Sequence, residues 1–260
     1  MSVLKVNNIS MSFGGVKAVS DVNMKIKSGE IIGLIGPNGA GKTTFFNLLT
    51  GIYTPTEGEI IYNFDKEVHP KKMKPYQIAE SGVGRTFQNI RLFGDMTVEE
   101  NVRVGFHKNI KYKLLSSLFR FSAYYKEEQN ASEKVTELLK TFNLYEKRDE
   151  MAKNLSYGEQ RRLEIARALA SNPKVLLLDE PAAGMNPNET NELMELIRWI
   201  KDKFDITIIL IEHDMSLVMS VCHRLYVLDY GKLIANGTPE EIKNNPAVIK
   251  AYLGGEDEAC

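Results

Sequence analysis

The sequence predicts an α/β fold built around a parallel sheet, with a flanking antiparallel β portion and an inserted helical subdomain. The first observation is a set of three apolar, β-branched runs at residues 31–35 (IIGLI), 175–178 (VLLL) and 206–211 (ITIILI). Runs without polar alternation are typical of strands buried on both faces of a parallel sheet. The second is that each run passes directly into polar or glycine-rich sequence: GPNGAGKTT, DEPAAG and EHD. Because ligands bind at the carboxyl ends of such strands, we expect one edge of the sheet to carry the chemistry.

Helical and antiparallel patterns surround these runs. Residues 3–64 contain short strands with turns at GG and SGE, which indicates the antiparallel portion. In 186–204, Asn186 is a candidate N-cap with Pro187 at the first helical position, and the apolar residues form one helix face. Residues 89–154 turn helical, opening on a capping box in TVEENV. We therefore expect one domain over 1–260, with 89–154 as the helical subdomain and 1–88 and 155–260 as the core.

Composition narrows the classes of protein. The 260 residues include 43% hydrophobic residues, enough for a sizeable core, and the net charge of -1 gives no electrostatic reason to expect nucleic acid as a partner. The apolar runs are far shorter than the roughly 20 residues that cross a bilayer, and no signal-peptide pattern opens the chain. We expect a cytoplasmic chain that does not span a membrane. Cys222 and Cys260 have no ligand spacing and are interpreted as free thiols.

The stretch GPNGAGKT, residues 36–43, fits the pattern G-x-x-x-x-G-K-[ST] between a predicted strand and a predicted helix. Its glycines let backbone N–H groups curl around phosphate, and the helix that follows presents its positive end. Lys42 is expected to reach the β and γ phosphates, and the Thr43 hydroxyl to ligate Mg²⁺. This pattern predicts the phosphate loop (P-loop) of a nucleoside triphosphatase. We therefore expect residues 1–88 and 155–260 to form a nucleotide-binding core. The candidate nucleotide-binding residues here are Gly36, Pro37, Asn38, Gly39, Ala40, Gly41, Lys42, Thr43 and Thr44.

The other two strands end on residues with acid–base chemistry. Asp179 and Glu180 close VLLLDE, and we assign Asp179 to the metal and Glu180 to the general base that polarises the attacking water. His213 follows the third strand, where the γ-phosphate should lie, and could bond to that phosphate or to the water. The remaining histidines have no such position and are interpreted as ordinary polar residues: His69, His107 and His223.

The stretch LSYGEQRR, residues 155–162, begins like a plain helix. Ser156 can accept from the backbone N–H of Glu159, whose carboxylate can reach back to the Ser156 N–H in a capping box. Yet Tyr157 and Gly158 stand where good helix formers would serve stability better. The stretch is therefore either a simple cap or a phosphate site, and in both cases we expect the Glu159 side chain to fold back onto Ser156.

The stretches GPNGAGKT, RTFQ, LSYGEQRR, VLLLDE and IEHD occur in this order, and the chain from about residue 3 to 255 resembles the nucleotide-binding subunit of an ABC transporter. The resemblance implies an ATPase that uses ATP and Mg²⁺. It implies that Phe13 in SFGG stacks on adenine, that Gln88 senses Mg²⁺ and the membrane partner, and that His213 is the switch histidine. It also implies a head-to-tail dimer, in which these residues act in trans on the second subunit's ATP: Ser156, Tyr157, Gly158 and Glu159.

Three positions depart from the usual ABC pattern. The usual signature reads Leu-Ser-Gly-Gly-Gln, whereas Tyr157 replaces the first glycine and Glu159 the glutamine. Asn186 stands where an aspartate is usual, so a water-positioning role that depends on the aspartate charge does not transfer to it. The phosphate and metal residues show no departure.

The resemblance also implies partners and a place in the cell. They are transmembrane permease subunits, an identical or related second ATPase subunit and, indirectly, a substrate-binding protein, at the inner face of a bacterial or archaeal membrane. The helical insert beside Gln88 is the expected docking face for the permeases. The segment 108–125 mixes Lys and Arg with Leu, Phe and Tyr, and two interpretations stay open: a membrane-surface segment, or a small helical core with solvated lysines.

The stretches RTFQNIRLF, QRRLEIARALA, DEPAAGMNP and LIEHDM and the tail ANGTPEEIKNNPAVIKAYLGG resemble the ATPase subunits of branched-chain amino acid importers. The ATPase of lipopolysaccharide export is the alternative; AAGMNP and the long insert after Gln88 favour the importer. A soluble ABC ATPase acting on ribosomes or DNA is an alternative of another class, which the single set of motifs and the lack of heptads disfavour. A non-hydrolysing subunit is disfavoured because Lys42, Asp179, Glu180 and His213 are all present.

Overall fold

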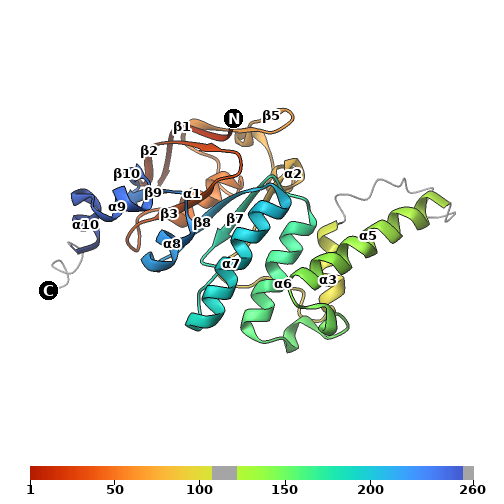
Figure 1. The fold of residues 1–260 in the computed structure, drawn as a ribbon. Coiled ribbons are helices and arrows are strands. Elements are labelled where there is room, and N and C mark those ends of the chain that lie inside the picture. Colours follow the sequence, from red (N-terminus) through yellow and green to blue (C-terminus); the bar gives the residue numbers. More distant parts are fainter. Residues whose placement is uncertain (107–121, 254–260) are drawn as a thin grey trace.

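The computed structural model describes residues 1–106 and 122–253, arranged as two sheets with helices around them (Figure 1). A six-stranded sheet has the order β10-β9-β3-β8-β7-β6, and a four-stranded sheet has the order β2-β1-β4-β5. The strands are β1 (Ser2–Phe13), β2 (Val16–Lys27), β3 (Ile31–Ile35), β4 (Glu57–Asn63), β5 (Glu67–Val68), β6 (Val83–Arg85), β7 (Val175–Asp179), β8 (Thr207–Ile211), β9 (Arg224–Asp229) and β10 (Lys232–Gly237).

The three apolar runs of the sequence form β3, β7 and β8 of the six-stranded sheet, which confirms the predicted parallel core. β3 pairs in parallel with β8 and β9, and β7 pairs in parallel with β6 and β8. Every residue of β3, β7 and β8 is buried. Alternate side chains enter opposite cores: Leu176 and Leu178 pack on one face, and Val175 and Leu177 on the other. Burial on both faces explains why these strands lack polar alternation.

The four-stranded sheet is the predicted antiparallel portion. β1 pairs with β2 and β4, and β4 pairs with β5, all antiparallel. Helix α1 (Lys42–Leu49) lies between this sheet and the parallel sheet: Phe45 and Phe46 are fully buried in one cluster with Leu4 of β1 and Leu34 of β3. The helix that follows the phosphate loop is thus held from both sides.

The remaining helices cover the parallel sheet and form a separate group beside it. In Figure 1, α3, α5 and α6 lie side by side, at the opposite end of the molecule from α10, and they pack on one another. The predicted helical subdomain ends at residue 154, so α6 belongs to the predicted core although it packs on α3 and α5. The division of the domain at residue 155 stays a prediction. The helices are α2 (Pro75–Ser81), α3 (Val98–Phe106), α5 (Ser122–Thr141), α6 (Tyr157–Ala170), α7 (Pro187–Phe204), α8 (Met215–Val221), α9 (Pro239–Lys243) and α10 (Pro246–Leu253), with 3-10 turns η1 (Pro70–Lys72), η3 (Tyr145–Lys147) and η4 (Ala152–Asn154).

The predicted helix starts are found at the expected residues. Asn186 accepts from Glu189 N at 3.0 Å, with Pro187 opening α7. Thr97 accepts from Glu100 N at 3.1 Å before α3. His107, Cys260 and the segment 108–125 lie outside the residues whose side chains the structure describes. Within the described ranges, no helix combines the length and the apolar content that a bilayer crossing requires.

Candidate functional site

The phosphate loop connects β3 to α1 through backbone conformations that require glycine. Gly36, Gly39 and Gly41 have φ of 151°, 79° and 99°. A Cβ on Gly36 would lie 2.0 Å from the Leu228 carbonyl oxygen, and one on Gly41 would lie 2.4 Å from that of Ala18. Any side chain at these two positions would collide with backbone, so the loop keeps its curl only with glycine. The first N–H groups of α1 receive no side-chain cap, which leaves this helix start suited to an anion.

Lys42 lies at the start of α1 and is 6% exposed. Its Nζ donates to the carbonyl oxygens of Gly36 at 2.7 Å and Pro37 at 2.9 Å. Burial lowers the pKa of Lys42, while the charges of Glu180 and Asp179 act in the opposite direction. The Lys42 ammonium is therefore folded over the loop and interacts electrostatically with the Glu180 and Asp179 carboxylates. Of the other loop residues, Ala40 is buried, Pro37 and Thr44 are partly exposed, and Asn38 and Thr43 are exposed.

The structure brings Glu180, His213 and Gln88 together. His213 Nε2 lies 2.7 Å from Glu180 Oε1, and Gln88 Nε2 donates to Glu180 Oε2 at 2.9 Å. Because a carboxylate only accepts, Nε2 of His213 carries the proton in this contact. Glu180 has a φ of 47°, a strained conformation for a non-glycine residue, and its N–H donates to Ile211 O. A strained backbone at the end of β7 thus aims this carboxylate toward β8 and residue 88.

Asp179 is held by a partner that the sequence analysis missed. Arg85 Nη2 donates to Asp179 Oδ2 at 3.0 Å, with side chains 7% and 5% exposed. Arg85 Nη1 also donates to Asn47 Oδ1 and Thr50 Oγ1 of α1 and the turn after it. Burial raises the pKa of Asp179, and Arg85 opposes that rise. The only sign of this contact in the sequence is a charged residue, Arg85, at the start of RTFQ. Its partner, Asp179, lies 94 residues away along the chain.

A second buried acid, Glu212, shapes the loop after Glu180. Its Oε1 accepts from Ala182 N at 2.8 Å, and it is 5% exposed. Burial raises the pKa of Glu212, and the backbone bonds from Ala182 and His213 oppose that rise. His223 is the ordinary polar residue that the sequence analysis expects, since its Nδ1 accepts from Ile31 N at 2.9 Å.

The start of α6 is the predicted capping box. Ser156 N donates to Glu159 Oε2 at 3.0 Å, and Glu159 N donates to Ser156 Oγ at 3.4 Å. This confirms the expected fold-back of Glu159. The same carboxylate also pairs with Lys147 Nζ of η3 at 2.8 Å. Burial opposes ionisation of Glu159, but the bonds from Lys147 and Ser156 outweigh it and hold its pKa below the usual range.

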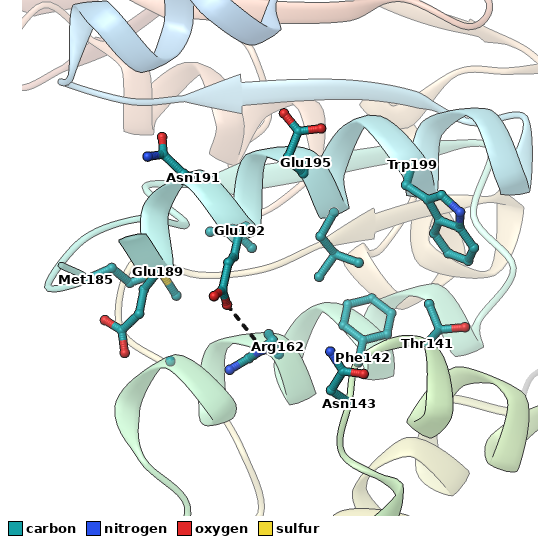
Figure 2. Close-up of a pocket in the computed structure, with 13 residues that line it drawn as sticks. Thr141, Phe142, Asn143, Arg162, Met185, Glu189, Asn191, Glu192, Glu195 and Trp199 are labelled. Carbon is teal, nitrogen blue, oxygen red and sulfur yellow. Dashed lines mark ion pairs between the residues drawn. The ribbon is translucent and has the colours of Figure 1, made fainter. Parts of the chain in front are cut away.

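A groove of about 770 Å³ lies between α6 and α7, and Gly158 of α6 is one of the residues that line it (Figure 2). Its wall includes the half-exposed Trp199 and the buried Phe142, and Arg162 Nη1 lies 3.9 Å from Glu192 Oε2 across it. The groove shares only Gly158 with the candidate site residues. It is therefore beside the signature stretch and not the nucleotide site.

Phe13 ends β1 and is 42% exposed, with its ring edge-on to Tyr53 at 5.1 Å between centroids. As the last residue of β1, Phe13 lies at the end of a strand of the antiparallel sheet. An exposed aromatic face is compatible with stacking, so its adenine-stacking role stays a prediction.

Comparison with known proteins identifies the family. A family model described as ABC transporter matches residues 19–183, and one described as branched-chain amino acid ATP-binding cassette transporter matches residues 232–258. The chain is 50% identical over 252 residues to the high-affinity branched-chain amino acid transport ATP-binding protein LivG of Salmonella typhimurium, covering 97% of this chain and 98% of LivG. It is 36% identical over 254 residues to the lipopolysaccharide export system ATP-binding protein LptB of Haemophilus influenzae, covering 98% of each.

A solved ATP-binding cassette of an ABC transporter, in its ADP conformation, superimposes with a TM-score of 0.82 at 32% identity, over 98% of this chain and 99% of that one. This likeness confirms the predicted P-loop α/β fold with its antiparallel portion. The chain therefore belongs to the ABC transporter family and is one of its ATPases.

Proposed function

We propose that this chain is the ATP-hydrolysing subunit of a branched-chain amino acid importer. The observation that carries the proposal is the 50% identity to LivG over nearly the whole of both chains. The match of residues 232–258 to the branched-chain amino acid family model supports the same substrate class. The identity to LptB, 36%, is lower over the same length, which favours import of an amino acid over export of lipopolysaccharide.

In this proposal the phosphates of ATP bind to the backbone N–H groups of the phosphate loop and the first turn of α1. Lys42 exchanges its bonds to the Gly36 and Pro37 carbonyls for phosphate oxygens. The residues present fit Mg²⁺, which prefers oxygen ligands and is usually held by few protein groups beside substrate phosphates. Thr43, Asp179 and Gln88 supply a hydroxyl, a carboxylate and an amide oxygen. Bound there, Mg²⁺ would neutralise charge that develops on the phosphates.

Glu180 acts as the general base that accepts a proton from the attacking water. Its two oxygens are engaged by His213 and Gln88, so both partners fix its direction before water arrives. Gln88 donates through Nε2 to Glu180, so its amide oxygen would be available as a ligand for the cation. The Nε2–H of His213, which donates to Glu180 in the structure, would instead donate to the γ-phosphate once ATP is bound. Phe13 would stack on the adenine through its exposed face.

A second ATPase subunit completes the site in trans through the start of α6. Ser156 and Tyr157 are exposed there, and the N–H groups around Gly158 lie at the positive end of the helix. The Glu159 carboxylate would repel phosphate, but its pairing with Lys147 and its bond from Ser156 offset that charge. Transmembrane permease subunits and a substrate-binding protein are the remaining proposed partners, and we place the chain at the inner face of the membrane. Nucleic acid is not proposed as a partner.

The test is purification of the chain with the membrane proteins that accompany it, followed by ATPase assay of the complex in vesicles. A binding protein loaded with leucine, isoleucine or valine should stimulate hydrolysis, and Glu180→Gln in the same complex provides the hydrolysis-deficient control. Hydrolysis without stimulation by any of the three amino acids would contradict the substrate class while leaving the ATPase intact.

A further inference from the structure

A buried ion pair joins the signature helix α6 to the loop that carries Gln88. Arg161 Nη1 donates to Glu164 Oε2 at 2.9 Å, and the two side chains are 0% and 1% exposed. Both residues lie in α6, three positions apart, so they project from the same face of the helix. A fully desolvated pair of this kind must satisfy its remaining polar atoms within the protein.

Most of the polar atoms of the pair bond to the backbone of residues 87–91, which we call the glutamine loop, while Arg161 Nε is buried without a hydrogen-bond partner. Arg161 donates to the carbonyl oxygen of Phe87 at 2.6 Å and to that of Gln88 at 2.8 Å. Glu164 Oε1 accepts from the N–H of Arg91 at 3.1 Å and, more weakly, from that of Phe87 at 3.4 Å. Two side chains of α6 therefore hold both ends of the loop by its main chain.

The same contacts continue to both functional ends. On one side, Arg161 Nη2 also donates to the hydroxyl of Tyr157, in the stretch proposed to meet the partner's ATP. On the other, the Gln88 side chain donates to Glu180. A continuous set of hydrogen bonds thus runs from the signature start to the proposed base, with Arg161 at its centre.

We infer that Arg161 and Glu164 form a positioning pair that ties the glutamine loop to α6, so that engagement of the signature end sets the position of Gln88 and, through it, of Glu180. The inference rests on the proposed roles of Gln88 and Glu180. Stability alone does not require an ion pair, because buried pairs are often replaced by apolar residues at no cost. What an apolar pair cannot reproduce is the bonding to the glutamine-loop backbone.

The first test compares Arg161→Met with Arg162→Met, a matched change at the next residue of the same helix, whose partner is Glu192 of the groove. Arg161→Met should lower kcat for ATP by about tenfold or more while KM changes by less than about twofold, because the phosphate loop is untouched. Arg162→Met should retain both values. An Arg161→Met enzyme with unchanged kcat would overturn the inference.

A double-mutant cycle with Gln88→Ala separates positioning from general damage. If Arg161 acts through Gln88, the single change Gln88→Ala should lower kcat at least about tenfold in the wild-type protein. The same change made in the Arg161→Met variant should lower kcat further by less than about threefold. Effects that multiply in full would overturn the inference while leaving the proposed function intact. A Gln88→Ala enzyme with wild-type kcat would instead remove the proposed role of Gln88, and this inference with it.

Hydrogen exchange gives a readout that needs neither nucleotide nor activity. In Glu164→Ala, the amides of Arg91 and Phe87 should exchange at least about tenfold faster, since Glu164 accepts from both. Unchanged exchange there would overturn the clamp itself. If Arg161→Met fails to fold, as judged by circular dichroism, Arg161→Lys keeps the charge and one donor direction, and should fold with an intermediate loss of kcat. Full activity of the folded lysine variant would also count against the inference.

Discussion

Arg85 is predicted to hold the Asp179 carboxylate in its charged form inside the protein. The change Arg85→Met removes a guanidinium 3.0 Å from Asp179 Oδ2 and keeps a side chain of similar length. Since both partners are less than a tenth exposed, the loss leaves a buried carboxylate without its counter-charge. Removing one member of a buried pair costs about 3 to 5 kcal/mol of unfolding free energy. This corresponds to roughly two to four orders of magnitude in the unfolding equilibrium constant.

The pH dependence follows from the direction of the Asp179 shift. Burial raises the pKa of Asp179, and Arg85 opposes the rise, so the variant should have a still higher pKa. A group whose pKa is raised by folding contributes stability that is fully present below its unfolded pKa, about 3.9, and lost as pH rises through its folded pKa. The stability difference between wild type and Arg85→Met should therefore grow from about pH 5 to about pH 8.

Urea unfolding followed by circular dichroism at both pH values measures this difference. Arg103→Met is the control, because Arg103 pairs with Glu99 and Glu128 through side chains that are about a third exposed. Such pairs contribute about 0 to 1 kcal/mol, with little change over this pH range. An Arg85→Met loss below about 1 kcal/mol, or a loss that shrinks towards pH 8, would refute the argument that Arg85 stabilises a charged Asp179.

The remaining predictions concern the nucleotide site, the signature and the buried thiol. Lys42→Ala should lose ATP binding, and an unchanged nucleotide affinity by fluorescence titration would contradict the phosphate-loop assignment. Glu180→Gln should bind ATP but trap a closed dimer on gel filtration, whereas wild-type turnover would remove its role as base. Glu159→Gln should leave ATP-driven dimerisation within about twofold, because Lys147 already neutralises the carboxylate; a marked rise would contradict its orientation. Burial raises the pKa of Cys222 to about 12, so iodoacetamide at pH 8 should leave Cys222 unlabelled in native protein and label it in urea, as read by mass spectrometry.

Much of the fold and part of the site follow from local sequence. β3, β7 and β8 are predictable because burial on both faces gives unbroken apolar runs, and the two capping boxes because their bonds span three residues. β6 escaped prediction because Val83–Arg85 is too short to show a period. β9 was not predicted either, because the charged residues Arg224 and Asp229 at its two ends leave only a short apolar run between them.

The side chains that contact the site residues could not be predicted from the sequence, for another reason. Arg85 meets Asp179 across 94 positions, and Arg161 meets the Gln88 carbonyl across 73. No local period connects such residues, so only the assembled sheet and helices reveal the contact. The sequence therefore predicts candidate site residues, but not the side chains that hold them in place.

The place of β3 in the sheet has a consequence for how the protein is made. β3 and the phosphate loop lie within the first 43 residues, yet β3 pairs with β8, which ends at Ile211, and with β9, which ends at Asp229. The Gly36 turn also lies against Leu228 of β9, whose carbonyl oxygen a Cβ on Gly36 would meet at 2.0 Å. During synthesis, the nucleotide pocket therefore cannot form its native shape until the residues up to Asp229 have left the ribosome. A nascent chain carries the ATP motif long before it can use it, and premature termination yields a fragment without a formed ATP pocket.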